Sequence, residues 1–261
     1  MPSILKKNQT QNDMIATSGD EIRIWESNQN ENYKLKCELK STNKPNVNSP
    51  ITSFDWNLSK QNVIGTSSVD TICTLFDVEK KIPVTQLVAH EKEVYDFCFN
   101  KNGQLFATAG GDSCVRTFDI RDLAHYMNAF ENKNSTPFLR VVWNHENENL
   151  LATIMYESSE IIIIDLRYPN ILYEKLINHE LNVNAISWSP NFSQYICSGG
   201  EDGRVLLWDL VSESSENILN SLIEPSFMYE IDEPINNIYW NFPFENSIII
   251  SFGNKFQILK L

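Results

Sequence analysis

Short runs of alternating apolar and polar residues, separated by turn residues, recur along the chain from Met14 onwards. The clearest example is Asn178–Asp209, which reads NHELNVNAISWSPNFSQYICSGGEDGRVLLWD. It holds apolar runs over 183–188, 195–198 and 205–208, with the turn GGEDG between the last two. Runs of this length with a period of two, bounded by Gly, Pro, Asn and Ser, predict β-strands. The sequence therefore predicts an all-β protein.

The same order of elements returns at an interval of about 40 to 45 residues, which is the period of WD40 repeats. Each predicted first strand ends in an aromatic residue, namely Trp56, Phe99, Trp143, Trp188 and Trp240. A large aromatic at one fixed place fills the space between neighbouring sheets, and its burial contributes about 2–3 kcal/mol. We expect a WD40 β-propeller over residues 14–261, after a poorly ordered polar segment at 1–13. Within this domain, residues 122–136 predict only a weak outer strand and a long loop.

Composition limits the partners to proteins. The chain has 261 residues, a net charge of −13 and a pI of about 4.8, which oppose direct binding to nucleic acid. Its apolar runs are too short to cross a bilayer, and Ile4 and Leu5 are too little for the apolar core of a signal peptide. The five cysteines are scattered without a CxxC pair, so we expect free structural thiols and no metal site.

His179, Ser198 and Asp202 raise the question of nucleophilic catalysis, with the serine attacking and the histidine acting as base. Their spacing relative to Trp208 instead matches the structural network of WD40 repeats, in which buried polar groups satisfy one another. No nucleophile-elbow sequence surrounds Ser198. We therefore expect a structural tetrad and a protein that is not an enzyme, with no catalytic, metal or cofactor-binding residues.

Other repeats keep parts of this set. His90, Thr108 and Asp112 stand at equivalent offsets, but Phe118 replaces the tryptophan and lacks its N–H, so this network is expected to be one member short. The repeat at 51–77 keeps Thr66 and Asp70 without a histidine, and the repeat at 138–165 keeps none of the set.

Several strings carry a closer resemblance, among them TSFDWN (52–57), AHEKEVYDFCF (89–99) and FLRVVWN (138–144). They resemble the WD-repeat proteins of the Transparent Testa Glabra and anthocyanin-eleven type. The animal counterpart of this group is a cullin-ligase-associated factor that scaffolds dual-specificity tyrosine kinases. The resemblance implies a non-catalytic, seven-bladed platform in nucleus and cytoplasm, acting as a monomeric subunit of larger complexes. Its implied partners are kinases and transcription factors.

An alternative function is implied by two WD-x-Arg-like boxes, FDIR and IDLR, whose candidate partner-binding residues are Asp119, Arg121, Asp165 and Arg167. In the family such a box serves a substrate receptor or adaptor of a cullin-four RING ubiquitin ligase. Both boxes lack the tryptophan, and two interpretations stay open. Either the arginines dock a partner, or each caps a strand end through a local carboxylate.

The resemblance also implies a segment that this chain does not show. Relatives carry about one and a half further N-terminal blades, including the first strand of the blade that contains Trp25, and an outer strand for the last blade. Residues 3–7 could supply at most one short strand. We expect the sequence to be truncated rather than to form an open ring.

Overall fold

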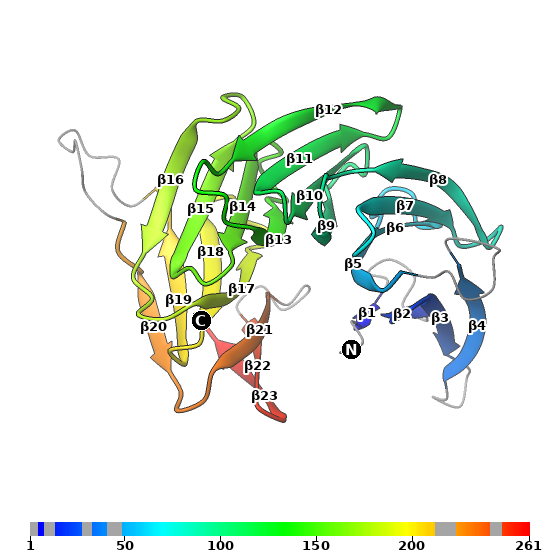
Figure 1. Cartoon of the computed structure of the whole chain (residues 1–261). Helices are drawn as coiled ribbons and strands as arrows, with labels where there is room; N and C mark the ends of the chain where they lie inside the picture. Colours follow the sequence, from blue (N-terminus) through cyan, green and yellow to red (C-terminus); the bar gives the residue numbers. More distant parts are fainter. Residues whose placement is uncertain (1–4, 8–13, 28–32, 41–48, 212–222, 241–246) are drawn as a thin grey trace. The chain divides into compact units, whose positions relative to one another are not determined.

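The computed structural model describes residues 5–7, 14–27, 33–40, 49–211, 223–240 and 247–261, and all its regular elements are β-strands (Figure 1). These strands form six antiparallel sheets. The prediction of an all-β fold made of WD40 blades is confirmed. The chain divides into two compact units, residues 1–137 and residues 138–261, with three sheets in each.

Each sheet of the first unit is built from strands that follow one another along the chain, and adjacent strands pair in antiparallel register. The first sheet comprises β1 (Leu5–Lys7), β2 (Met14–Ser18), β3 (Ile22–Ser27) and β4 (Tyr33–Leu39). The second comprises β5 (Ile51–Trp56), β6 (Val63–Ser68), β7 (Ile72–Asp77) and β8 (Ile82–Val88). The third comprises β9 (Val94–Phe99), β10 (Leu105–Gly110), β11 (Cys114–Asp119) and β12 (Asp122–Glu131).

The second unit repeats this plan. Its first sheet comprises β13 (Phe138–Trp143), β14 (Leu150–Met155), β15 (Glu160–Asp165) and β16 (Leu172–Ile177). The next comprises β17 (Val183–Trp188), β18 (Tyr195–Gly200), β19 (Arg204–Asp209) and β20 (Phe227–Glu230). The last comprises β21 (Ile235–Trp240), β22 (Ser247–Phe252) and β23 (Lys255–Lys260), so among the described residues it has three strands, as expected.

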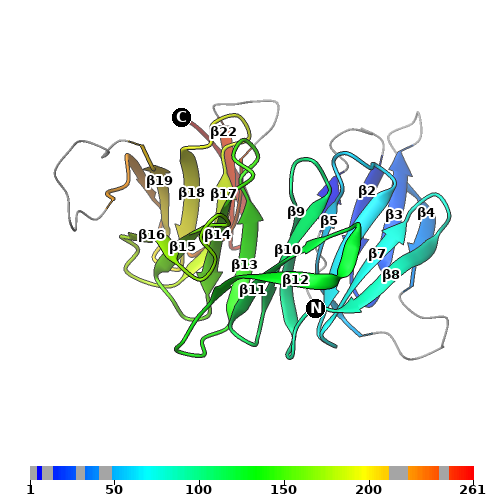
Figure 2. The same cartoon turned by 90° about the horizontal axis from the view of Figure 1, so that it is seen from above.

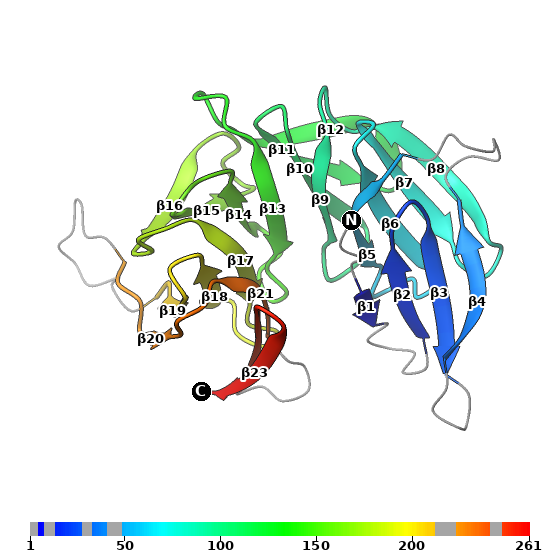
Figure 3. The ribbon, with the colours of Figure 1, turned by 60° about the horizontal axis from the view of Figure 1, so that its bottom comes forward.

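The N-terminal expectation needs a correction. Leu5–Lys7 form β1, which pairs with β2 so that Leu5 lies opposite Thr17 (Figure 3). The sheet that contains Trp25 therefore has a fourth strand, the one short strand that residues 3–7 could supply, and poor order over 1–13 does not hold for Leu5–Lys7. The remainder of that segment, 1–4 and 8–13, lies outside the described residues. The open edge of β2 offers backbone N–H and C=O groups, and even a three-residue strand satisfies several of them.

The outer strand of the third sheet was also underestimated. Residues 122–131 form β12, which runs for ten residues along β11 (Figure 2). Two register shifts, at Val115/Arg116 and at Phe118/Asp119, interrupt the pairing. These irregularities break the period-two pattern, which is why alternation alone predicted only a weak strand.

The core lies between neighbouring sheets of each unit, and the aromatic ends of the first strands are part of it. All five are buried, as predicted: Trp56, Phe99, Trp143, Trp188 and Trp240. In the first unit, one cluster joins Ala16 and Ile24 of the first sheet to Trp56 of the second. In the second unit, Ile163 packs in one cluster with Trp188 and Trp208.

Polar side chains bind the first strands of neighbouring sheets to one another. Thr52 donates to the carbonyl of Val94, and Asn184 at the equivalent place donates to the carbonyl of Ile235 at 2.9 Å. Three residues further on, Asp55 accepts from the backbone N–H of Phe99 at 3.0 Å. Ser187, the equivalent of Asp55, accepts from the N–H of Trp240 at 3.2 Å. These two-point links fix the register between first strands, and alternation within one strand does not reveal them.

A buried asparagine directly after a first strand supports the next loop. Asn144 accepts from the backbone N–H groups of Glu146 and Asn147 at 3.0 and 2.9 Å. Its amide donates to the carbonyl of Ser193 in the following sheet at 2.8 Å. Asn57 makes the same set of contacts in the first unit, ending on the carbonyl of Gly103 at 2.8 Å. The asparagine therefore joins two blades through a loop.

Replacing the buried Asn144 with alanine removes three partly buried hydrogen bonds, so we expect Asn144→Ala to lower the free energy of unfolding by about 2–3 kcal/mol. Urea denaturation followed by tryptophan fluorescence measures the change. Asn147→Ala is the matched control, since the side chain of Asn147 accepts one exposed bond from the N–H of Asn149. Equal midpoints for the two variants would disprove the role of Asn144.

Candidate functional site

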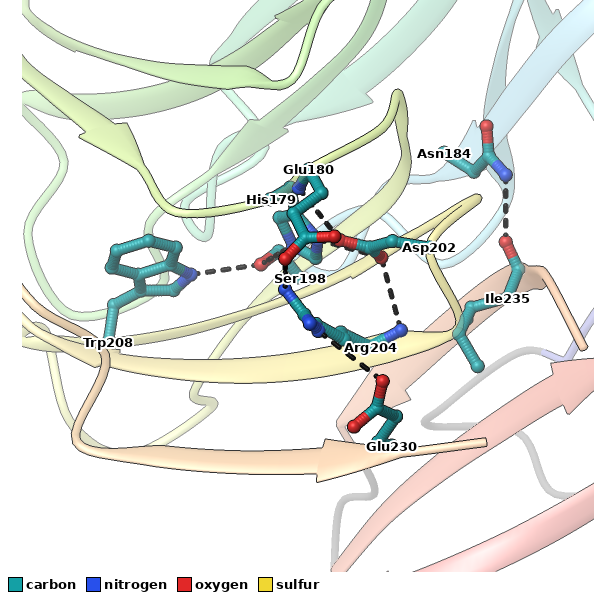
Figure 4. A network of polar contacts seen from close by, with 9 residues as sticks. All are labelled: His179, Glu180, Asn184, Ser198, Asp202, Arg204, Trp208, Glu230 and Ile235. Carbon is teal, nitrogen blue, oxygen red and sulfur yellow. Dashed lines mark hydrogen bonds and ion pairs between the residues drawn. The ribbon is translucent and has the colours of Figure 1, made fainter. Parts of the chain in front are cut away.

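The network around His179 is complete (Figure 4). His179 Nδ1 lies 3.0 and 3.1 Å from the two carboxylate oxygens of Asp202, and Nε2 lies 2.8 Å from Ser198 Oγ. The indole of Trp208 donates to the same Ser198 oxygen at 2.9 Å. Burial lowers the pKa of His179, which favours the neutral ring. The ring then donates from Nδ1 to Asp202 and accepts the Ser198 hydroxyl proton at Nε2.

This arrangement leaves no nucleophile. Ser198 is fully buried, and its oxygen is occupied by the imidazole on one side and the indole on the other. A catalytic serine needs an exposed oxygen with an oxyanion site beside it. His179, Ser198, Asp202 and Trp208 therefore form a structural network, as the spacing predicted.

Asp202 also accepts hydrogen bonds from the backbone of two loops and so holds them in place. One carboxylate oxygen accepts from the N–H of Glu180, in the loop before β17, at 3.0 Å. The other accepts from the N–H of Arg204 at 3.1 Å, closing the β18–β19 turn. That turn needs Gly203, whose φ is 73°, and it needs Gly200, since a Cβ there would lie 2.7 Å from His179 Nδ1.

The network of the third sheet lacks the indole contact, as predicted, and contains an arginine that the sequence analysis had not assigned to it. His90 lies 2.8 Å from Asp112 and 2.8 Å from Thr108, as expected. The ring of Phe118 has no N–H to offer Thr108, whose hydroxyl lies 3.4 Å from the carbonyl of Arg116. Arg116 adds its own guanidinium, 3.1 Å from Asp112 and 2.7 Å from the carbonyl of Ala89. The set therefore lacks the indole member, as predicted, and Arg116 adds a contact to Asp112 that the spacing of Phe118 does not reveal.

Neighbouring charges and hydrogen bonds decide the pKa of Asp112. Burial alone would raise the pKa of this carboxyl, but His90, the Glu91 N–H and Arg116 together lower it to about 2. The guanidinium of Arg116 also lies over the ring of Tyr126, 4.6 Å from its centroid. The one sequence signal for this role was an arginine inside the otherwise uncharged run CVRTF.

The first two sheets keep only parts of the His–Ser/Thr–Asp–Trp network. Trp25 donates to Thr17 at 2.9 Å, a pair equivalent to Trp208 and Ser198 that the sequence had not indicated because its turn is two residues shorter. In the second sheet, Thr66 donates to the carbonyl of Thr74 at 3.2 Å, whereas Asp70 accepts from the hydroxyl of Ser68. The predicted Thr66 and Asp70 thus serve separate local contacts.

Each WD-x-Arg-like box holds its arginine against its own aspartate. Arg121 makes a two-pronged contact with Asp119 at 2.9 and 2.5 Å, and its backbone N–H donates to the same carboxylate at 2.9 Å. Arg167 and Asp165 repeat the geometry at 3.0, 2.6 and 2.9 Å. The arginine lowers the pKa of each aspartate, for Asp119 to about 2. The local-carboxylate interpretation describes these contacts, and partner docking stays a prediction.

The two boxes differ in their surroundings. The guanidinium of Arg167 lies 5.9 Å from the ring centroid of Tyr168, and the side chains of Tyr168, Ile171 and Tyr173 are more than half exposed. Arg121 is followed by Asp122, which lies 3.1 Å from His125. Aromatic residues and arginine together are typical of interface hot spots, and the Arg167 box has that composition.

The cysteines are free and buried, as predicted, and burial raises the pKa of Cys73 and Cys197. In the part of the chain that the structure describes, no group of three or more His, Cys, Asp or Glu residues could hold a metal ion. None of the described residues forms a helix long and apolar enough to cross a membrane.

The family model "WD domain, G-beta repeat" matches residues 81–119 and 171–209. The chain is 38% identical over 256 residues to a DDB1- and CUL4-associated factor 7 homolog of Dictyostelium discoideum, covering 98% of this chain and 77% of that protein. The chain belongs to this family of WD-repeat proteins. The chain is also 28% identical to an uncharacterized WD repeat-containing protein of Schizosaccharomyces pombe, and the match covers 100% of this chain and 73% of that protein. A WD repeat-containing protein of Saccharomyces cerevisiae is 35% identical, over 77% of this chain and 46% of that protein.

Membership in this family, together with the buried Ser198, makes the chain a non-catalytic WD-repeat scaffold or adaptor. Its partners are proteins. The surfaces available to them are the loops that the structural networks hold in place and the edges of the sheets.

Removing the carboxylate of the complete network should destabilise the protein. Asp202→Ala leaves buried His179 without its partner, so we expect a loss of about 1–3 kcal/mol in the free energy of unfolding. Thermal denaturation followed by circular dichroism measures it. Asp232→Ala, in an exposed loop, is the control and should leave the melting temperature unchanged. A melting temperature equal to wild type in Asp202→Ala would count against the network.

Buried His179 should also make stability depend on pH. Its pKa is lowered in the folded protein from the ordinary value of 6.5, so the unfolded chain takes up the proton first as pH falls. The stability that neutral, buried His179 contributes should therefore be fully present above about pH 6.5, and the free energy of unfolding should decrease below that pH. Urea denaturation between about pH 5 and 8 tests this. His179→Gln should flatten the dependence, whereas His125→Gln, at a side chain that is 83% exposed, should not.

Proposed function

We propose that this protein is a scaffold that holds kinases and transcription regulators together, in nucleus and cytoplasm. The observation that carries the proposal is the family relationship over 98% of the chain. Within that family, the strings TSFDWN and AHEKEVYDFCF favour a member of the Transparent Testa Glabra and anthocyanin-eleven type.

The chemistry of the loops supports a scaffold. Asp112 and Asp202 hold turns in one geometry, while the neighbouring Glu91 and Glu180 are exposed. A loop that is ordered before binding loses little entropy when a partner arrives. With a net charge of −13, the protein favours basic segments of its partners, and their association should weaken as salt increases.

Affinity purification of the tagged chain, followed by mass spectrometry at low and high salt, tests this function. Kinases or transcription regulators should be recovered at low salt and depleted at high salt. Recovery of ligase subunits alone, with neither class of client, would overturn the proposal in favour of the adaptor function.

The second candidate function is an adaptor of a cullin-four ubiquitin ligase. The name of the Dictyostelium relative records an association with DDB1 and CUL4. What favours the function here is the Arg167 box, in which a fixed guanidinium lies beside exposed Tyr168 and Ile171. Because Asp165 already orients the arginine, a partner would meet a preformed contact.

If the boxes dock the ligase, Arg121→Ala combined with Arg167→Ala should lose the ligase adaptor in a pull-down, without lowering the recovery of kinases. Both arginine side chains are more than half exposed, but Arg167→Ala leaves the buried carboxylate of Asp165 without its ion pair, so urea denaturation must first confirm that the double variant stays folded. Arg140→Ala, on the exposed position of β13, is the control. Undiminished recovery of the adaptor with the double variant would exclude this role.

A further inference from the structure

The outer strand of the second sheet differs from the other outer strands in its composition. β8 reads IPVTQLV and has no ionisable side chain. Each of the other outer strands, β4, β12, β16, β20 and β23, carries at least one. Charged side chains on an edge strand normally prevent other strands from pairing with it. β8 lacks this protection, and its side chains are open: Ile82 is 49%, Val84 58% and Val88 71% exposed.

The backbone of β8 is arranged to accept a further strand. The N–H of Ala89 donates to the carbonyl of Thr71 at 2.9 Å, and backbone groups alternate in direction along a strand. The polar groups of Leu87 therefore face β7, whereas the N–H and C=O of Val88 face away from it. Pairing between β7 and β8 is regular from Ile72–Val88 to Leu75–Thr85. β8 is the last strand of its sheet (Figure 1).

The other end of β8 is protected. A register shift lies between Leu75 and Phe76, and Pro83, which has no N–H, follows there. Bulges and prolines are the usual means of ending an exposed edge. The pairing segment is therefore the C-terminal half of β8, around Val88.

From these observations, we propose that the edge of β8 binds an extended segment of a partner protein, which adds to the sheet as a fifth strand. The edge fits an uncharged segment of alternating aliphatic residues, because backbone pairing supplies affinity and the open Val84 and Val88 contact alternate side chains. Lys80 and Lys81 lie in the turn beyond the protected end of β8, so the part of an antiparallel segment that continues past its paired residues should carry carboxylates near its C-terminus. Lys80 also lies 3.5 Å from Asp77, so an incoming carboxylate would compete with that contact. This interface is independent of the scaffold and adaptor functions proposed above.

A synthetic peptide of alternating threonine and valine that ends in two glutamates tests the proposal on the full chain. Fluorescence anisotropy measures its affinity, and NMR-detected amide exchange locates it. Binding should slow exchange at the Val88 amide. Val88→Pro removes the outward N–H without removing a bond to β7, so it should weaken binding about tenfold. Val88→Ala keeps the N–H and should change the affinity less than about threefold.

A charge-reversal variant, Lys80→Glu with Lys81→Glu, should weaken the same peptide several-fold, and this effect should shrink as salt increases. Urea denaturation of each variant confirms that it folds. Absence of binding by the peptide, equal affinity for Val88→Pro and Val88→Ala, or protection confined to another strand would each overturn the proposal. Concentration-dependent dimers that protect Val88 without peptide would assign the edge to a second copy and overturn it as well.

Discussion

The structure depends on sheets that pack face to face, so that the middle strands of a blade are buried on both sides. This packing is served by an aromatic residue at the end of the first strand in five of the six sheets, namely Trp56, Phe99, Trp143, Trp188 and Trp240. It also encloses polar groups that water cannot reach, and each unsatisfied group would cost about 1–3 kcal/mol. The hydrogen-bond networks and the asparagine contacts follow from that requirement.

The same requirement is met by different residues in different blades. In the fifth sheet, Trp208 and His179 both contact Ser198. In the third, the phenylalanine at the equivalent position packs in a cluster of aromatic rings, and a guanidinium from β11 reaches Asp112. The fourth sheet relies on apolar packing, with a run of four buried isoleucines over 161–164. What the blades share is therefore the packing of buried strands, whereas the residues that satisfy buried polar groups differ from blade to blade. In the second sheet, the buried indole N–H of Trp56 has no hydrogen-bond partner among the described residues.

Much of the fold could be predicted because period-two alternation and the aromatic ends are local signals. The strands β17, β18 and β19 lie within two residues of the runs expected at 183–188, 195–198 and 205–208 for this reason. The parts that could not be predicted depend on contacts between distant residues. Lys6 of β1 is polar and has no alternation to reveal its pairing with Ala16, and the irregular register of β12 hides its length. Arg116 reads as a solvated charge until β11 is known to bury it against Asp112.

The candidate site was predictable to the same degree. The offsets of His179, Ser198 and Asp202 from Trp208 follow from strand and turn lengths, which are local. Whether Arg121 and Arg167 cap a strand or meet a partner depends on where their side chains point, and sequence spacing allows both. The contacts show that the two interpretations are compatible, since Asp119 and Asp165 occupy one side of each guanidinium while most of the side chain stays exposed.

An exposed arginine that is held by its own aspartate can make binding specific without catalysis. An arginine that moves freely loses rotamer entropy on binding, whereas one held by a two-pronged carboxylate has lost it already. Asp165 is almost fully buried, so it cannot turn away from Arg167 without exposing the strand end that it caps. The position of the guanidinium is thus set by the packing of the blade. In the proposed docking, folding energy rather than the partner would order the contact, and the same principle applies to the turns that Asp112 and Asp202 hold.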